Sequence, residues 1–276
     1  MKPTTEQQHI IELIPTRANI AIQARAGAGK TSTLKLIAES YPEKTFCAIY
    51  FNKANVEELN NSGSKPDNLI GTTIHSAAYK AVMLGGFVDK LSPFLDFNDI
   101  KQSDLDELCT CIGVPRSNWK KMSITFTKVI LEVIKEFCKS DAYTIAEVAN
   151  AVLPDLLDSE LEGCEDILIK VIRNHWIYIT DSNMAKITHD VYLKMFQLRK
   201  LQLTQVWDSV AKCNRKVDVI MLDEAQDSNP VTLGIVANQN IQKIIVGDSA
   251  QSIYGWRGAV GTMEVFEEWQ QASLTT

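Results

Sequence analysis

The segment from Ala24 to Thr31 reads ARAGAGKT and lies between a short apolar run and a stretch with helical character. Small residues here let backbone N–H groups wrap around phosphates, and the following helix adds the positive end of its dipole. Ala24 stands where the pattern GxxxxGK[ST] has its first glycine. A glycine-rich turn with an incidental lysine is the alternative interpretation of this segment alone. Phosphate binding by such a loop requires a strand before it and a helix after it.

Strand-like and helix-like segments alternate along the first 80 residues and return near the end of the chain. Strands are predicted at Ala18–Gln23, Thr45–Phe51, Val217–Leu222 and Lys243–Val246, and a helix at Thr31–Ser40. Such alternation is typical of a parallel sheet. We therefore predict one α/β domain formed by residues 1–79 and 201–276, whose two sequence halves share a single sheet.

The stretch between these halves has apolar residues at helical spacing. One helix face is predicted to carry Phe126, Ile130, Val133, Ile134 and Phe137. The pairs Thr144 with Glu147 and Ser159 with Glu162 have the spacing of capping boxes at helix starts. We predict that residues 80–200 form a helical insertion subdomain.

The glycine-rich segment supplies the first candidate site for a cofactor, ATP. Lys30 would reach the β- and γ-phosphates, and the Thr31 hydroxyl would bind Mg²⁺. The candidate nucleotide-binding residues of this loop are Ala24, Gly27, Ala28, Gly29, Lys30, Thr31 and Ser32.

A second candidate element follows the strand predicted at Val217–Leu222, which runs directly into DEAQD. Asp223 can hold Mg²⁺ and Glu224 can orient the attacking water, so both are candidate catalytic residues together with Lys30. By itself, DEAQD could also be the solvated acidic start of a helix. Its position after a strand, in combination with Lys30 and Thr31, favours a site that hydrolyses a nucleotide.

A third candidate element, VGDSAQSIYGWRGA, covers Val246–Ala259. Asp248 would lie near the metal, and Gln251 could bond the γ-phosphate and contribute to catalysis. Tyr254, Trp256 and Arg257 follow, and aromatic rings beside a guanidinium suit stacking on unpaired bases. A lone tryptophan is more often a packing residue, so the functional interpretation depends on its closeness to Gln251.

Composition limits the remaining classes of function. The 28 Lys and Arg against 34 Asp and Glu give a net charge of −6, so DNA binding would need a local groove rather than a basic surface. The six cysteines form no CxxC pair, which favours reduced thiols over zinc ligands or disulfides. No stretch is apolar enough to span a membrane or resembles a signal peptide, so we expect a cytoplasmic or nuclear protein.

Taken in order, the three elements resemble the Walker A, Walker B and third motifs of the UvrD/Rep branch of superfamily 1 helicases. In TTEQQ at 4–8, Gln7 matches the adenine-reading glutamine of that family. YFNKA at 50–54 and TTIH at 72–75 are similar to its DNA-contacting motifs, which implies DNA contacts for Tyr50, Phe51, Asn52, Thr73 and His75. The short FNK and DEAQD contexts are most similar to the F-box DNA helicase subgroup and its bacterial and phage relatives. Arg25, Ser249 and Ala250 depart from common family residues.

The resemblance implies a RecA-like P-loop NTPase domain of a helicase that moves along single-stranded DNA, in the 3′ to 5′ direction, using ATP and Mg²⁺. Family enzymes continue with a fourth motif and a second RecA-like domain, which we expect to be missing because the chain ends near that motif. A partner or the missing domain would then have to supply the arginine that assists hydrolysis. The alternative is a truncated nucleotide- or DNA-binding module without helicase activity; a P-loop kinase or GTPase would leave DEAQD and QSIYGWRG without a role.

Overall fold

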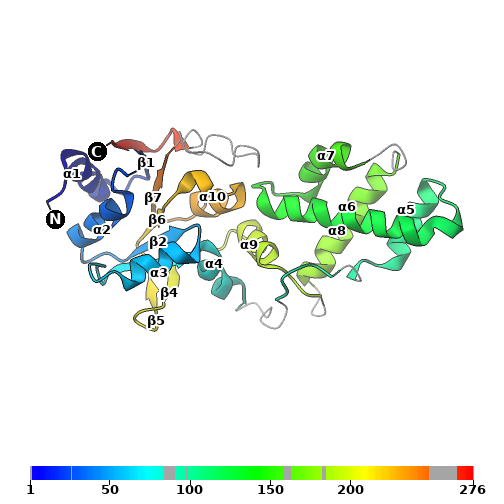
Figure 1. Cartoon of the computed structure of the whole chain (residues 1–276), viewed down its shortest axis with the longest axis horizontal. Coiled ribbons are helices and arrows are strands. Elements are labelled where there is room, and N and C mark those ends of the chain that lie inside the picture. Colours follow the sequence, from blue (N-terminus) through cyan, green and yellow to red (C-terminus); the bar gives the residue numbers. More distant parts are fainter. Residues whose placement is uncertain are drawn as a thin grey trace. The chain divides into compact units, whose positions relative to one another are not determined.

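The computed structural model describes residues 2–25, 27–83, 91–96, 99–157, 163–181, 185–248 and 266–275. The chain divides into two compact units (Figure 1). An α/β unit comprises Met1–Ala81 and Lys200–Thr276, and a helical unit comprises Val82–Arg199.

A six-stranded parallel sheet organises the α/β unit, with strand order β3-β2-β6-β7-β1-β8. Its strands are β1 (Ile20–Ala24), β2 (Phe46–Tyr50), β3 (Leu69–Thr73), β6 (Val219–Leu222), β7 (Gln242–Gly247) and β8 (Gln270–Leu274). Strands from the two sequence halves interleave, so β6 and β7 lie between β2 and β1. This confirms the prediction of an α/β domain whose separated halves share one parallel sheet.

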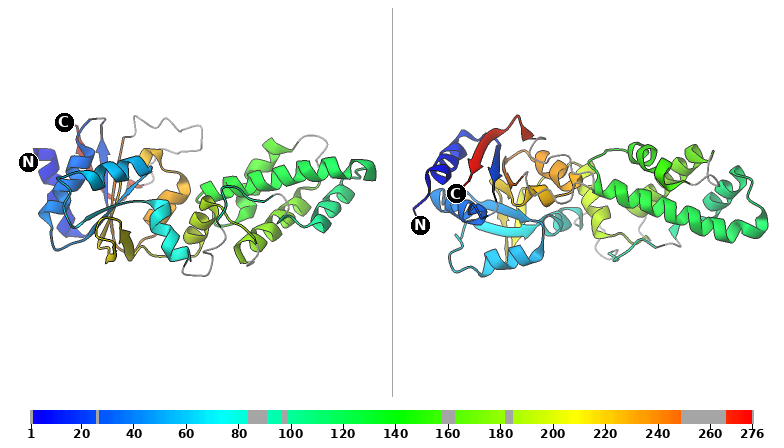
Figure 2. Two further views of the ribbon diagram at one scale, coloured as in Figure 1. Left: turned by 60° about the horizontal axis from the view of Figure 1, so that its bottom comes forward. Right: turned by 45° about the horizontal axis from the view of Figure 1, so that its top comes forward.

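Helices connect and cover these strands. They are α1 (Thr5–Leu13), α2 (Lys30–Ser40), α3 (Lys53–Asn61), α4 (Ile74–Met83) and α10 (Pro230–Ala237), with 3₁₀ turns η1 (Ile14–Thr16) and η5 (Ala225–Asp227). Strands β2, β6 and β7 are buried along their whole length, as expected for parallel strands covered on both faces. Helix α1 lies beside β8, where the Thr275 backbone N–H donates to the Glu6 carboxylate at 2.8 Å, and the two chain ends are neighbours (Figure 2).

Several strands were not predicted from the sequence. Strand β3 (LIGTT) and edge strand β8 (QQASL) contain few apolar residues, and an antiparallel hairpin of β4 (Gln205–Asp208) and β5 (Cys213–Lys216) is largely polar. The predicted strands agree with the structure to within about two residues at each end, which is the usual uncertainty of boundaries. Helix α2 begins at Lys30, one residue before the predicted start.

The helical unit is built from helices, and no strand of a sheet lies among its described residues. They are α5 (Gln102–Cys111), α6 (Trp119–Lys139), α7 (Ile145–Leu156), α8 (Glu165–Asp181) and α9 (His189–Leu198), with the 3₁₀ turn η4 (Arg116–Asn118). The predicted apolar face of α6 is confirmed, because Phe126, Ile130, Val133, Ile134 and Phe137 are all buried. Thr144 caps α7 by accepting from the Glu147 backbone N–H, whereas Ser159 and Glu162 lie outside the described residues.

A buried lysine ties the end of α6 to α9. Lys194 is fully buried, and its Nζ donates to the backbone oxygens of Ser140 and Ala142 and to Gln197 Oε1. The ammonium also lies 4.2 Å from the centroid of the Phe137 ring. Burial lowers the pKa of Lys194 to about 8. Every donor of the side chain thus has an oxygen acceptor despite its burial.

All six cysteines are in the described part of the chain, and none of them is in a disulfide. Within the described ranges, no three His, Cys, Asp or Glu side chains converge in the manner of a metal cluster. None of the helices among these residues has the length and apolar character that a bilayer crossing requires.

Candidate nucleotide-binding site

The glycine-rich loop connects the end of β1 to the start of α2. Gly27 and Gly29 have φ values of 76° and 73°, in the left-handed region that glycine adopts without strain. Gly29 is the N-cap of α2, so the first N–H groups of the helix follow it directly. These N–H groups have no partners inside the helix and carry the positive end of its dipole. The loop therefore has the backbone geometry of an anion site.

The side chains of this loop divide into two groups. Ala24 and Ala28 are buried, so they contribute packing and backbone rather than side-chain contacts. Thr31 and Ser32 are exposed in the first turn of α2, which leaves the Thr31 hydroxyl accessible to a ligand. Ala26 lies outside the described residues.

Lys30 and Glu224 form an ion pair, although 194 residues separate them in sequence. The pair joins the start of α2 to the carboxyl end of β6, and Lys30 is 11% exposed whereas Glu224 is 29% exposed. Glu224 has a φ of 51°, a left-handed conformation that costs a non-glycine residue about 1 kcal/mol or more. Its N–H donates to Asp223 Oδ1 at 2.9 Å. The structure thus brings together Lys30 and Glu224, two of the four predicted catalytic residues, from the two sequence halves of the α/β unit.

Gln226 extends this pair into a network, and it was not singled out from the sequence. Its Nε2 donates to Glu224 Oε2 at 2.7 Å, and its Oε1 accepts from the Asp248 backbone N–H at 3.0 Å. Gln226 is buried and lies on the turn η5 after β6. Through Gln226, the end of β6 is connected to the end of β7, where the third predicted element begins. Its place within DEAQD could have identified Gln226 as a candidate, but its contact with the Asp248 N–H depends on the three-dimensional fold.

Asp223 is a buried carboxyl group whose pKa is raised to about 6. Burial is the largest cause and the charge of Glu224 the second, while the Glu224 N–H and Lys30 act in the opposite direction. Burial and Glu224 also raise the pKa of Asp227. A cation would relieve the repulsion between these neighbouring carboxylates.

The surroundings of Asp223 fit a magnesium ion. Mg²⁺ is usually held by one or two protein oxygens together with waters and phosphate oxygens, which matches a set consisting of Asp223 and Thr31. The Tyr50 hydroxyl is buried with no hydrogen-bond partner among the described residues, and the charge of Asp223 contributes to its raised pKa. Buried polar atoms normally have partners, so this hydroxyl is an unsatisfied polar group near the carboxylate.

Comparison with known proteins identifies the family. A model described as "UvrD/REP helicase N-terminal domain" matches residues 3–271. The chain belongs to the UvrD/Rep helicase family. It is 32% identical over 274 residues to F-box DNA helicase 1 of Gallus gallus, which covers 95% of this chain and 25% of that protein. It is 24% identical over 277 residues to the ATP-dependent DNA helicase Rep of Buchnera aphidicola, covering 92% of this chain and 38% of that protein.

A fission yeast relative gives the same result. The chain is 26% identical over 266 residues to F-box DNA helicase protein 1 of Schizosaccharomyces pombe, covering 93% of this chain and 28% of the relative. Two of these relatives are named F-box DNA helicases, which agrees with the subgroup that the FNK and DEAQD segments resemble. The chain spans between about a quarter and two fifths of the length of these three relatives.

Gln7, which matches the adenine-reading position of UvrD/Rep helicases, is buried at the start of α1. Its Oε1 accepts from the Thr4 N–H at 3.0 Å, and its Nε2 donates to Thr33 Oγ1 at 3.1 Å. The side chain therefore completes the capping box of α1 and contacts α2. This arrangement fixes α1 next to the glycine-rich loop, and a contact between Gln7 and adenine remains a prediction.

The positions that match DNA-contacting motifs of UvrD/Rep helicases differ in exposure. Phe51 is 54% exposed, whereas Tyr50 is 3% exposed and packs in the core, where its ring has no open face for a base. Asn52 and Thr73 both accept hydrogen bonds from helix N-termini, at Asn55 and Ser76 respectively. The exposed ring of Phe51 is therefore a better candidate for base stacking than that of Tyr50.

Of the remaining candidate residues, His75 lies in the described part of the chain. His75 is half-buried in the first turn of α4, directly after β3. Residues 249–265 lie outside the described residues, and they include Gln251, Tyr254, Trp256 and Arg257.

Proposed function

We propose that this chain is the first RecA-like motor domain of a DNA helicase and that it binds and hydrolyses Mg·ATP. The observation that carries the proposal is the network from Lys30 through Glu224 and Gln226 to Asp248, which joins three elements at the carboxyl ends of neighbouring strands. Ligands of open parallel sheets bind at the carboxyl ends of the strands. Membership of the helicase family supports the same reaction.

The proposed roles follow from the position of each side chain. The loop N–H groups and Lys30 would bind the β- and γ-phosphates, and Thr31 and Asp223 would hold Mg²⁺. The metal ion would neutralise charge that develops on the transferred phosphoryl group. Glu224, which accepts a hydrogen bond from Gln226, would orient the attacking water, and Gln251 would report the γ-phosphate. A bound phosphate would compete with Glu224 for Lys30, so nucleotide binding would release the carboxylate.

Titration of Mg·ATP into a Lys30→Ala variant tests the assignment. Charge-assisted hydrogen bonds are worth about 1.5–3 kcal/mol, so affinity should fall roughly ten- to a hundredfold. Lys35→Ala is a matched control on the same helix, because its Nζ bonds Ser62 rather than the loop. Equal affinities of all three proteins would show that the nucleotide lies elsewhere.

The complete protein is proposed to move along single-stranded DNA in the 3′ to 5′ direction. This requires a second motor domain, in the same polypeptide or in a partner, to close on ATP and to supply an arginine. A DNA substrate would place the protein in the cytoplasm, or in the nucleus of a eukaryote. Phe51 and the sequence positions of Tyr254, Trp256 and Arg257 support a path for the strand, together with Asn52, Thr73 and His75.

Binding of a labelled single strand distinguishes this path from the nucleotide site. Phe51→Ala and Trp256→Ala should each weaken DNA binding by about 1–3 kcal/mol if a base stacks on the ring, with Mg·ATP affinity unchanged. Tyr143→Ala is the control, because Tyr143 is an exposed aromatic ring of the helical unit. Loss of ATP and DNA binding together would identify Phe51 or Trp256 as packing residues. No loss in either variant would place the DNA path elsewhere.

A further inference from the structure

Two cysteines from different helices lie close together in the helical unit. Cys111 is the last residue of α5, and Cys164 directly precedes α8. The Cys111 Sγ donates to the Gly163 backbone oxygen at 3.8 Å, although 52 residues separate these two residues in sequence. Because a carbonyl oxygen is three covalent bonds from the Cα atom of the next residue, the Cys111 sulfur lies beside the backbone of Cys164.

A second contact holds the same face of α5 against α8. Glu107 lies one helical turn before Cys111, and its carboxylate accepts from the Lys170 Nζ at 3.0 Å. Between Glu107 and Cys111 the partner changes from Lys170 to Gly163, so the two helices run antiparallel where they touch. The approach of the two cysteines is therefore part of the packing of α5 on α8.

The turn before α8 fixes the position of Cys164. Gly163 has a φ of 85°, and its N–H donates to Glu165 Oε1 at 3.1 Å. The Cys164 carbonyl accepts from the Leu168 N–H at 2.8 Å, in the first turn of the helix. A disulfide requires Cα atoms about 4.4–6.8 Å apart. Cys111 is in the exposed last turn of α5, where opening of the backbone costs least, so it is the residue that adjusts to this distance.

The two thiols differ in accessibility. Cys111 is exposed, whereas Cys164 is 1% exposed. Burial is the largest cause that raises the pKa of Cys164 to about 11, followed by the charges of Glu165 and of Cys111. The effect of Cys111 shows that the two sulfurs are near enough to interact. Because thiolates rather than thiols react with oxidants, the exposed Cys111 is the group that an oxidant modifies first.

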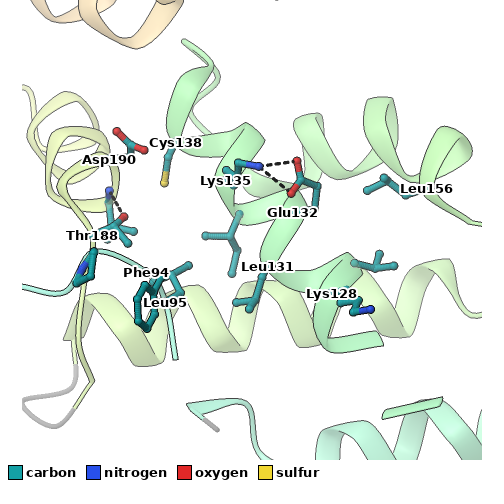
Figure 3. Close-up of a pocket in the computed structure, with 14 residues that line it drawn as sticks. Phe94, Leu95, Lys128, Leu131, Glu132, Lys135, Cys138, Leu156, Thr188 and Asp190 are labelled. Carbon is teal, nitrogen blue, oxygen red and sulfur yellow. Dashed lines mark hydrogen bonds and ion pairs between the residues drawn. The ribbon is translucent and has the colours of Figure 1, made fainter. Parts of the chain in front are cut away.

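Other cysteines of the chain have different surroundings. Cys138 lines an apolar groove of about 700 Å³ in the helical unit (Figure 3), and no second cysteine is among the described residues that line it. Cys109 is fully buried, and its position two residues before Cys111 places it on the opposite side of α5. Cys213 is exposed but belongs to the α/β unit. These cysteines serve as internal comparisons for the pair at α5 and α8.

We propose that Cys111 and Cys164 form a reversible disulfide when the protein meets hydrogen peroxide. The Cys111 thiolate attacks one peroxide oxygen, which breaks the O–O bond, forms a sulfenic acid and releases hydroxide. The Cys164 thiolate then attacks the Cys111 sulfur and displaces a second hydroxide. Each hydroxide takes up the proton released by one thiol. Two thiols and one peroxide thus give one disulfide and two waters, with the sulfurs oxidised and the peroxide oxygens reduced.

Such a bond would join the end of α5 covalently to the start of α8. Transient disulfides of this kind are the form in which intracellular proteins sense oxidants. None of the proposed nucleotide-binding residues belongs to the helical unit, so the proposal does not depend on the ATP site.

Peptide mapping of the 276-residue chain after treatment with hydrogen peroxide tests the proposal. Remaining thiols are blocked with iodoacetamide in denaturant, and a tryptic digest is analysed by mass spectrometry without reduction. The peptide of residues 102–116 should be linked to the peptide of residues 140–170, with the summed mass less two hydrogens. Dithiothreitol should abolish this species. The number of titratable thiols should fall from six to four, because the bond consumes two.

Variants assign the bond to its two sulfurs. Cys111→Ser and Cys164→Ala should each abolish the linked species, whereas Cys213→Ser, at an exposed position of the α/β unit, should retain it. The peptide of residues 102–116 also contains Cys109, so a link that persists in Cys111→Ser would overturn the proposal. Circular dichroism checks folding, and Cys111→Ser decides the assignment by itself if Cys164→Ala is unfolded. Absence of the link in the folded, peroxide-treated chain, or disulfides only between two chains, would also overturn it.

Discussion

The α/β unit and the helical unit both bury a charged group, but they treat it in opposite ways. Asp223 in the α/β unit is buried next to a second carboxylate, so its pKa rises. Lys194 in the helical unit is buried among oxygen acceptors and above an aromatic ring, so each of its donors has a partner. A buried charge with an unfavourable neighbour is typical of a functional site, whereas a satisfied one is typical of a structural role. We therefore expect that neutralising Lys194 lowers the free energy of unfolding, whereas neutralising Asp223 raises it.

The largest expected effect concerns the independence of the two units. Phe126→Ala removes a fully buried ring from α6, and such truncations cost about 3–5 kcal/mol. Hydrogen exchange followed by mass spectrometry should show faster exchange in residues 99–157, with Mg·ATP affinity unchanged. Ile124→Ala, at an exposed position of the same helix, should alter stability by less than about 0.5 kcal/mol. A parallel loss of nucleotide affinity in Phe126→Ala would mean that the units are energetically coupled.

Lys194→Met should destabilise the helical unit by about 1–3 kcal/mol, because the carbonyls of Ser140 and Ala142 lose their donor. The pH dependence sharpens this prediction. The folded pKa of about 8 is below the ordinary value of 10.5, so between these pH values the unfolded chain holds the proton that the folded chain has released. Unfolding free energy of the unmodified chain, relative to Lys194→Met, should therefore rise from pH 8 to 10.5.

Denaturant titrations of both proteins at a series of pH values measure this difference. Asp141, Glu147 and Cys138 also affect the pKa of Lys194, and they are present in both proteins, so their contributions largely cancel. A difference that is constant across this range would show that Lys194 titrates alike in both states.

Asp223→Asn should have the smallest effect on stability and the opposite sign. The amide keeps an oxygen that accepts the Glu224 N–H but removes the repulsion between carboxylates, which should stabilise the α/β unit by about 0.5–2 kcal/mol at pH 7. Binding of Mg·ATP should weaken in the same variant, because Asp223 is the proposed magnesium ligand. Asp67→Asn, at an exposed position, is the control and should change neither property. Destabilisation by Asp223→Asn would remove the contrast between the two buried charges.

The sequence was sufficient for the elements that contain continuous apolar runs. The strands before Arg25, Phe51, Asp223 and Asp248 and the apolar face of α6 were predicted because buried parallel strands and amphipathic helices have distinct periodicities. Strand β8 alternates between buried and exposed residues at the sheet edge, and its QQASL sequence has no such run. The β4–β5 hairpin was missed for the same reason, since its stabilising pair of Asp208 and Arg215 is polar.

The residues of the candidate site could be predicted from the sequence, but the hydrogen bonds between them could not. Lys30 and Glu224 could be assigned to one site, because each follows a strand and the carboxyl ends of parallel strands share one edge. The link from Gln226 to the Asp248 N–H depends on the adjacency of β6 and β7, which no local pattern specifies. Tyr50 is buried because it is the last residue of β2, whereas Phe51 follows the strand and is exposed.

Strand β1, which ends at the glycine-rich loop, pairs with β7 on one side and with β8 on the other. Strand β7 is synthesised roughly 220 residues after β1 and β8 roughly 250 residues after it. On a ribosome adding 5–20 residues per second, β1 therefore waits on the order of ten to fifty seconds for these partners. The helical unit leaves the ribosome during this interval and has all its segments available for folding. A nascent chain of this protein thus exposes the apolar residues Ile20 and Ile22, together with two open strand edges, until β7 and β8 have been synthesised.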